Sequence, residues 1–182
     1  MRVSHEANIG GGYASKPARF LQHTLKGPIY CSGTGLHSGA RVSLALKPAA
    51  PDTGVVFRRT DVRGDDTIIP GRFDRVSDTR LCTTLSNEAG VSVSTVEHLM
   101  AALSGCALDN VVVEVSGAEL PIMDGSSEPF VFLIDCAGVV AQDAPRRAIR
   151  VRKPVTVREG RSMARIEPWN GSTCLLYTSD AA

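Results

Sequence analysis

The chain has 182 residues, of which 43% are hydrophobic and 21% are charged, and its formal net charge is +1. This composition is typical of a soluble globular protein, and the length allows one generous domain or one domain and part of another. The near-neutral charge and scattered basic residues give no reason to expect a nucleic-acid partner. The apolar runs are too short to span a bilayer, and no signal peptide is recognisable.

Cysteine usage bears on the redox compartment. The five cysteines are an odd number and include no C-x-x-C pair: Cys31, Cys82, Cys106, Cys136 and Cys174. This pattern favours reduced thiols over a disulfide framework or a cysteine zinc site. We therefore expect a cytoplasmic protein.

The first half of the chain predicts a tail followed by strands. Residues 1–22 are rich in Gly, Ser and Ala without sustained periodicity, which indicates a mobile tail. Residues 33–39 are a glycine-rich segment, which could cradle a phosphate but lacks the P-loop ending and the full G-x-G-x-x-G pattern, so a tight turn is the simpler interpretation. Short apolar or alternating runs predict strands at residues 29–32, 42–46, 55–58, 67–69 and 81–85.

Residues 94–103 predict an amphipathic helix that ends near Gly105. Its apolar stripe has the spacing i, i+3, i+4 and i+7 and consists of Val96, Leu99, Met100 and Leu103. At about 100° per residue, His98 points away from this stripe. Its neighbours on the helix are small, namely Thr95, Ala101 and Ala102.

The following segments complete a fold prediction. The valine-rich run at residues 110–115 suits a buried strand, and residues 121–127 form a tight loop. Ser127 is expected to cap a second helix, with Pro129 in its first turn and Gly138 after its end. The order of strands, helix, strand and helix predicts an α+β fold: a two-layer sandwich of a mostly antiparallel sheet with two helices on one face.

A new pattern begins near residue 145. Residues 149–158 alternate, with a break at Pro154, and residues 163–166 alternate again. Two strands cannot build a core alone. We therefore predict a first domain at residues 23–144 and the first strands of an incomplete second domain at residues 145–171.

The pair Glu97–His98 has two interpretations from the residues alone. Ser94-x-x-Glu97 fits a capping box, and His98 is then a core histidine bonded to a carbonyl. His98 is otherwise a metal ligand, but the spacings of H-E-x-x-H and H-x-x-E-H are absent, so any further ligands come from distant segments. Asp124 is most simply a turn residue, although it could also orient a neighbour.

Five segments taken together resemble one family, the UDP-3-O-acyl-N-acetylglucosamine deacetylases of lipid A synthesis. They occur in the family's order and spacing across residues 24–169. The matching segments are residues 33–39 (GTGLHSG), 78–85 (DTRLCTTL), 94–103 (STVEHLMAAL), 109–110 (DN) and 121–126 (PIMDGS).

The resemblance implies zinc-dependent hydrolysis of the N-acetyl group of a UDP-linked acylated amino sugar, with release of acetate. It assigns His98 as a Zn²⁺ ligand and Glu97 as the general base that takes a proton from the zinc-bound water. The residues at substrate-lining positions are Leu36, Leu81 and Cys82, and those at supporting positions are His37 and Asp124. The family relationship also implies a cytoplasmic enzyme that is a monomer in its native form.

The chain also departs from the family pattern. Family members take two further ligands from an H-K-x-x-D helix in a second domain and a general acid from a later histidine, whereas the other histidines here are His5, His23 and His37. We therefore expect an amino-terminal fragment that is inactive alone, with an exposed face around His98 and a non-native or frameshifted tail at residues 172–182. The alternative is a non-catalytic α+β module in which Ser94 and Glu97 only cap a helix.

Overall fold

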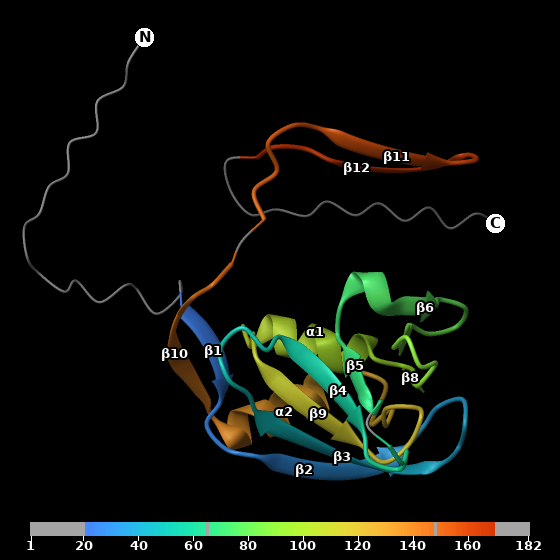
Figure 1. The fold of residues 1–182 in the computed structure, drawn as a ribbon, viewed down its shortest axis with the longest axis vertical. Coiled ribbons are helices and arrows are strands. Elements are labelled where there is room, and N and C mark those ends of the chain that lie inside the picture. Colours follow the sequence, from blue (N-terminus) through green and yellow to red (C-terminus); the bar gives the residue numbers. More distant parts are fainter. Residues whose placement is uncertain (1–20, 65, 148, 170–182) are drawn as a thin grey trace, which may run out of the picture. The chain divides into compact units, whose positions relative to one another are not determined.

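The computed structural model describes residues 21–64, 66–147 and 149–169 (Figure 1). The expectations for residues 1–20 and 172–182 fall outside these described residues. The chain divides after Arg146 into two compact units, and each is described by itself. In the described part of the chain, no helix is long and apolar enough to cross a membrane.

The described residues of the first unit form an α+β fold, as the sequence predicts. Strands expected at residues 29–32, 42–46, 55–58 and 67–69 correspond to β2, β3, β4 and β5. The elements of this unit are β1 (Leu21–Leu25), β2 (Ile29–Thr34), β3 (Arg41–Pro48), β4 (Val55–Arg59), β5 (Ile68–Pro70), a 3-10 turn (Phe73–Arg75), β6 (Val76–Asp78), β7 (Thr84–Ser86), β8 (Ser92–Val93), α1 (Glu97–Gly105), β9 (Val111–Val115), α2 (Glu128–Ala137) and β10 (Val139–Pro145).

The main sheet has five strands in the order β2-β3-β9-β4-β5. Its pairs are antiparallel except for β4 and β9, which run parallel with Phe57 opposite Val113. A second, three-stranded sheet has the order β6-β7-β8, and β1 pairs with β10. The central strand β9 is the valine run of the sequence, and its alternate residues Val111, Val113 and Val115 are fully buried.

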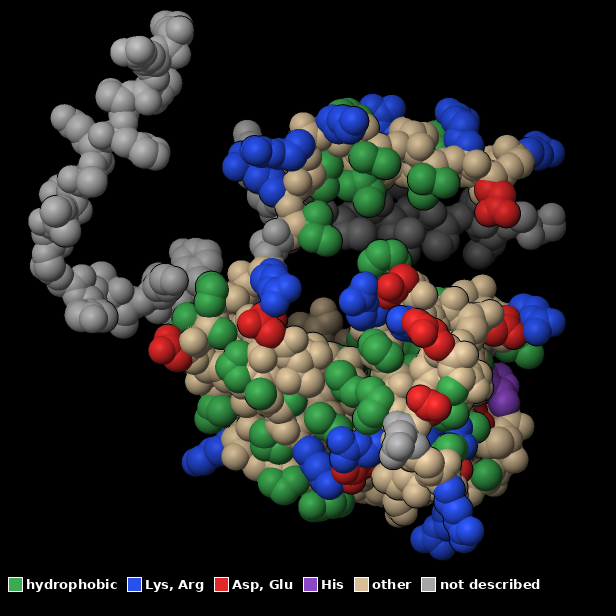
Figure 2. All heavy atoms as spheres, in the orientation of Figure 1, with side chains coloured by type: hydrophobic (Ala, Val, Ile, Leu, Met, Phe, Trp, Pro, Cys, Tyr) green, Lys and Arg blue, Asp and Glu red, His purple; other side chains and the backbone are tan. Residues whose placement is uncertain are grey.

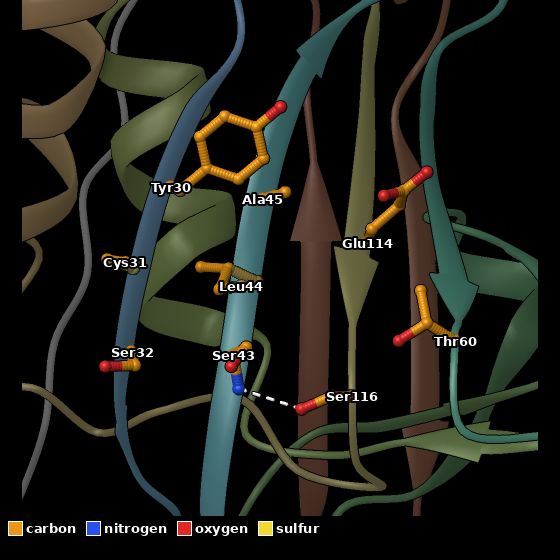
Figure 3. A pocket seen from close by; sticks show the side chains of 9 residues that line it. All are labelled: Tyr30, Cys31, Ser32, Ser43, Leu44, Ala45, Thr60, Glu114 and Ser116. Atoms are coloured by element: carbon orange, nitrogen blue, oxygen red, sulfur yellow. Dashed lines mark hydrogen bonds between the residues drawn. The ribbon is translucent and has the colours of Figure 1, made fainter.

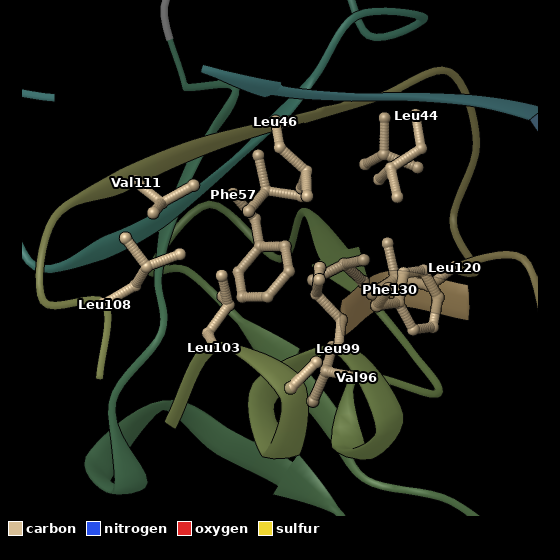
Figure 4. Packing of buried hydrophobic residues seen from close by; sticks show 14 of the residues in the cluster. Leu44, Leu46, Phe57, Val96, Leu99, Leu103, Leu108, Val111, Leu120 and Phe130 are labelled. Atoms are coloured by element: carbon tan, nitrogen blue, oxygen red, sulfur yellow. The ribbon is translucent and has the colours of Figure 1, made fainter. Parts of the chain in front are cut away.

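The core lies between the main sheet and the two helices (Figure 4). Figure 4 shows Leu99 and Leu103 of α1 facing Phe57 of β4 and Leu46 of β3. Three of the four predicted stripe residues of α1 are fully buried and Met100 is half-buried, so the predicted helical face is confirmed. Because α1 and α2 also contact each other, both helices cover the same face of the sheet.

The strand pair β1–β10 was not expected from the sequence. β1 begins at Leu21, so Leu21 and Gln22 lie in a strand rather than in the predicted tail. Gln22 is buried, and its side chain is held by Asn110 and Asp52. Asn110 also binds Gln142 of β10 at 2.7 Å, so a buried amide network joins the pair to the rest of the unit.

Two local predictions were wrong in detail. The strand expected at residues 81–85 begins only at Thr84, because Leu81 has a φ of 66°, which a strand does not allow. Ser127 stands directly before α2 but makes no side-chain capping bond, and the Glu128 amide instead donates to Ser126 Oγ at 3.2 Å. Pro129 does lie in the first turn, and Gly138 ends the helix with a φ of 73°.

The second unit is a hairpin of β11 (Val155–Glu159) and β12 (Ser162–Ile166). Every residue of both strands is exposed. Residues 147–169 hold seven of the 20 Lys and Arg residues but only two acidic residues, so the basic residues are less scattered than we expected. Figure 2 shows basic side chains gathered over this hairpin, whereas the visible face of the first unit mixes both charges.

Candidate functional site

Glu97 and His98 are the first two residues of α1, and both are half-buried. The Glu97 carboxylate accepts a hydrogen bond from the backbone amide of Thr83, with N–O distances of 3.0 and 3.3 Å to its two oxygens. This contact ties the helix start to the segment that carries Leu81 and Cys82. It also suits a carboxylate at the positive end of the helix dipole.

The capping-box interpretation of Ser94 and Glu97 is wrong. The helix begins at Glu97, one residue after Val96, and no side chain caps it. Ser94 instead pairs with the chain after β9: its amide and hydroxyl both donate to the Ala118 carbonyl, at 2.8 and 3.1 Å. Because Val96 is the N-cap, Glu97 is the first residue of the helix, whereas a capping box requires the acidic residue at the third position.

Thr95, two residues before α1, has a strained backbone conformation. Its φ is 57°, in the left-handed region that a β-branched residue rarely adopts. Such a residue costs about 1–2 kcal/mol and persists only where its surroundings hold it. Here Thr95 is buried, and its hydroxyl donates to the Glu119 carboxylate at 3.1 Å. Leu81 and Met123, in two other candidate segments, share a positive φ.

The glycine-rich segment is a turn between β2 and β3, as predicted, and a carboxylate holds it. The backbone amides of His37 and Ser38 each donate to Glu119 at 2.9 Å, and Ser38 Oγ donates at 2.6 Å. Leu36 and His37 are exposed on this turn. A Cβ at Gly35 would collide with the Glu119 carboxylate and with Ser38 Oγ, so the turn requires glycine there.

Glu119 is the residue that sequence reasoning missed. Its side chain is only 6% exposed. Burial alone would raise its pKa, but the bonds from His37, Ser38 and Thr95 outweigh that effect and lower the pKa to about 2. The available signal was a lone acidic residue directly before the apolar pair Leu120–Pro121. Such a residue is expected to find donors if it is buried.

Asp124 lies in an exposed loop and accepts bonds from the amide and hydroxyl of Ser126, at 2.9 and 2.8 Å. These bonds, and to a smaller extent the nearby charge of His98, lower the pKa of Asp124. The loop is therefore the turn that the sequence predicts.

One of the surface pockets on the first unit reaches Glu97. That pocket has a volume of about 350 Å³, and Thr83, Glu97, Met100 and Phe73 contribute to its wall. Another, of about 450 Å³, lies over β2, β3 and β9 (Figure 3). Figure 3 shows Tyr30 and Glu114 at its rim, and no candidate residue lines it.

Hydrogen bonds link two of the candidate segments to the start of α1. The 81–83 segment reaches Glu97 through Thr83, and the 36–38 turn reaches Thr95 through Glu119. Cys82 is half-buried, with Sγ 3.9 Å from Thr84 Oγ1, whereas Leu81 is 91% exposed. Within the described ranges, no three His, Cys, Asp or Glu residues group closely enough to hold a metal.

The expected exposed face around His98 is confirmed only in part. Ala101 is exposed, but Thr95 and Ala102 are buried within the first unit itself. Some of the small residues therefore pack inside the first unit, whereas Ala101 lies on the outer face of the helix. The described cysteines are free thiols (Cys31, Cys82, Cys106 and Cys136), and Cys174 falls outside the described residues.

Comparisons with known proteins define the class. The sequence model of the UDP-3-O-acyl N-acetylglycosamine deacetylase family matches residues 22–181. Similar curated proteins named UDP-3-O-acyl-N-acetylglucosamine deacetylase come from Photobacterium profundum (49% identity), Vibrio campbellii (50%) and Xanthomonas campestris pv. campestris (52%), each over 150 residues or 82% of this chain. The chain belongs to this family. It spans about half the length of the curated relatives it matches.

Proposed function

We propose that this chain carries part of the active site of a zinc-dependent deacetylase that removes the N-acetyl group from a UDP-linked, 3-O-acylated N-acetylglucosamine and releases acetate. The observation that carries the proposal is the fixed Glu97 carboxylate beside His98 at the start of α1. The names of the relatives support the reaction and the substrate class.

Glu97 is suited to act as a general base. An ionised carboxylate offers about four acceptor positions, and the shared bond from the Thr83 amide leaves some of them open. The same bond limits rotation of the side chain, so the carboxylate stays beside the Thr83 amide. Because Glu97 also lines the pocket of about 350 Å³, a substrate group can approach it from solvent.

His98 is the residue that would hold the metal, through a ring nitrogen. A bound Zn²⁺ would lower the pKa of its water towards ~7 and polarise the acetyl carbonyl. A catalytic zinc usually has three protein ligands, and the described residues offer His98 without a group of three. We therefore propose that the 182-residue chain binds zinc weakly and does not turn over substrate by itself.

The supporting assignments follow the same reasoning. Leu36 and Leu81 are exposed apolar residues on segments held against the helix start, which suits contact with an acyl chain. Cys82 lies next to Thr83, and His37 is fixed by its backbone amide while its ring stays exposed. The cytoplasmic location and the monomeric state remain predictions of the family relationship.

The first test measures zinc content and acetate release. The chain alone is expected to show substoichiometric zinc and no acetate release, and tight one-to-one zinc with turnover would contradict this. A longer polypeptide that extends this chain with the H-K-x-x-D segment is expected to bind one zinc and release acetate. A longer polypeptide that binds zinc but releases no acetate would reject the proposed reaction.

Glu97→Gln in the longer polypeptide separates catalysis from structure. The amide oxygen still accepts the Thr83 bond, but the side chain no longer takes up a proton, so acetate release should fall about 10²–10⁴-fold with zinc retained. Glu128→Gln is the matched control, because Glu128 is the exposed first residue of α2. Loss of zinc in Glu97→Gln would instead give Glu97 a structural role.

A further inference from the structure

We propose that Glu119 is a positioning residue that couples the turn at residues 35–38 to the start of α1. It thereby sets where Leu36 and His37 lie relative to Glu97 and His98. The relevance of this coupling to catalysis rests on the proposed function, whereas the coupling itself is a property of the fold.

The two carboxylate oxygens of Glu119 accept hydrogen bonds from different donors, and one of the oxygens links the turn to the segment before α1. Oε2 accepts both bonds from Ser38, from its amide and its hydroxyl. Oε1 accepts the His37 amide at 2.9 Å and the Thr95 hydroxyl at 3.1 Å. One oxygen atom therefore contacts the turn and the residue that precedes the helix, although His37 and Thr95 are 58 positions apart in the sequence.

The backbone holds Glu119 from both sides. The Ser94 amide donates to the Ala118 carbonyl at 2.8 Å, and the Leu120 amide donates to the Ser94 carbonyl at 3.0 Å. This short pairing places Glu119 beside Thr95, whose positive φ needs an external hold. The Glu119 carboxylate and Ser38 Oγ lie so close to Gly35 that a Cβ would not fit there, so the turn packs directly on Glu119.

Charge is part of this arrangement. Four donors converge on one carboxylate, and hydrogen bonds to an ionised acceptor are the stronger ones. In Glu119→Gln, the amide nitrogen is a donor that faces the Ser38 amide and hydroxyl or the His37 amide. The substitution keeps the size of the side chain, but it replaces the ionised acceptor with a neutral one and removes at least one of the two backbone amide bonds.

Amide hydrogen exchange in the 182-residue chain tests the coupling directly. Thr95→Val removes one donor on the helix side only. If Oε1 links the two segments, exchange at the His37 and Ser38 amides should quicken about fivefold, the scale expected for one lost hydrogen bond. Exchange at the Val113 amide in the centre of the sheet should stay unchanged. In a Glu119→Gln background, Thr95→Val should have a smaller effect on the turn than in wild type, because the ionised acceptor that both segments share is gone.

The control variant is Glu114→Gln. Glu114 lies in β9 and pairs with Lys47 at 2.6 Å and Arg58 at 3.3 Å, away from the turn. It should leave exchange at His37 and Ser38 unchanged. Unchanged rates at these amides in Thr95→Val would overturn the proposal, as would a rise no greater than that at Val113, because the latter reports only global opening.

The longer polypeptide then tests the catalytic consequence. Glu119→Gln should lower kcat/KM for acetate release about tenfold with zinc content unchanged, and Glu114→Gln should not. Equal kcat/KM in both variants would overturn the positioning role. The exchange result stands independently, so a longer wild-type protein without acetate release would reject the proposed function and leave exchange to decide the coupling.

Discussion

Two strand regions of similar sequence pattern behave differently in this protein. β9 (VVVEV) and β11 (VTVRE) are each five residues long, and each has valine at its first and third positions. In β9, Val111, Val113 and Val115 are fully buried because α1 and α2 cover that face of the sheet. In β11, Val155 and Val157 are 49% and 63% exposed. The valines predict a strand in both places, but burial requires a second layer.

The hairpin β11–β12 has apolar residues on one side, and these residues are exposed. Val155 pairs with Ile166 and Val157 with Ala164, so these apolar residues share one side of the two strands. An isolated two-stranded hairpin is marginally stable in water. We therefore expect the free energy of unfolding to come from residues 21–146.

Leu99→Ala should cause the largest loss. Leu99 is completely buried between α1 and the sheet, and its truncation leaves a cavity that costs about 3–5 kcal/mol in the free energy of unfolding. Urea unfolding followed by circular dichroism measures the loss. Leu81→Ala is the matched control, because Leu81 is 91% exposed and should change stability by less than about 0.5 kcal/mol. Equal losses would contradict the core described here.

Asn110→Ala should follow with a loss of about 2 kcal/mol. Its amide group donates to Gln22 and Gln142 at 2.7 Å each and accepts the Gly54 amide at 2.8 Å. Removing it leaves buried partners without their bonds and frees the pair β1–β10 from the core. Amide exchange should quicken first at His23 and Ala141, which face each other in that pair. Exchange that quickens uniformly across the sheet would contradict a local role.

Glu119→Gln should alter the dependence of stability on acid. The pKa of Glu119 is lowered from 4.5 to about 2, so its ionised form favours the folded state. This contribution is complete above about pH 4.5 and is lost as the pH falls through about 2. The stability difference between wild type and Glu119→Gln should therefore shrink as the pH falls below 4.5. Urea unfolding at pH 6, 4.5, 3.5 and 2.5 checks this, and a constant difference would contradict it.

Val157→Ala should have the smallest effect. Val157 belongs to the exposed hairpin, so the urea unfolding transition of residues 21–146 should shift by less than about 0.5 kcal/mol. Val113→Ala, the same substitution in β9, should cost several times more because Val113 is fully buried. Similar losses for the two valines would show that the hairpin has a covering layer in solution.

Sequence reasoning recovered the fold where a periodic pattern was long enough to show. The stripe from Val96 to Leu103 predicts a helix and its buried face, and the valine run of β9 predicts a buried strand. Strands β6, β7 and β8 have two or three residues, which is too short for a recognisable period. The sequence did not predict β10, because Gln142 and Asp143 interrupt its apolar character. In the fold, Gln142 accepts a hydrogen bond from Asn110.

For the candidate site, the sequence located the segments but not how they are held. Glu97 and His98 are adjacent in the chain, so their proximity required no tertiary information. The bond from Thr83 to Glu97 and the role of Glu119 both join residues 14 to 82 positions apart, and no local pattern reports such contacts. The prediction of a capping box was wrong for the same reason: Ser94 donates its amide to the distant Ala118 carbonyl, which no local pattern indicates.

The position of β9 in the main sheet also governs the order in which this protein is assembled during synthesis. The pairs β2–β3 and β4–β5 are local and can form as soon as each emerges from the ribosome. They remain two separate ribbons, each with an open edge, until residues 111–115 insert between them. We thus expect the nascent chain to be most prone to association with its neighbours while residues 71–110, between β5 and β9, are synthesised.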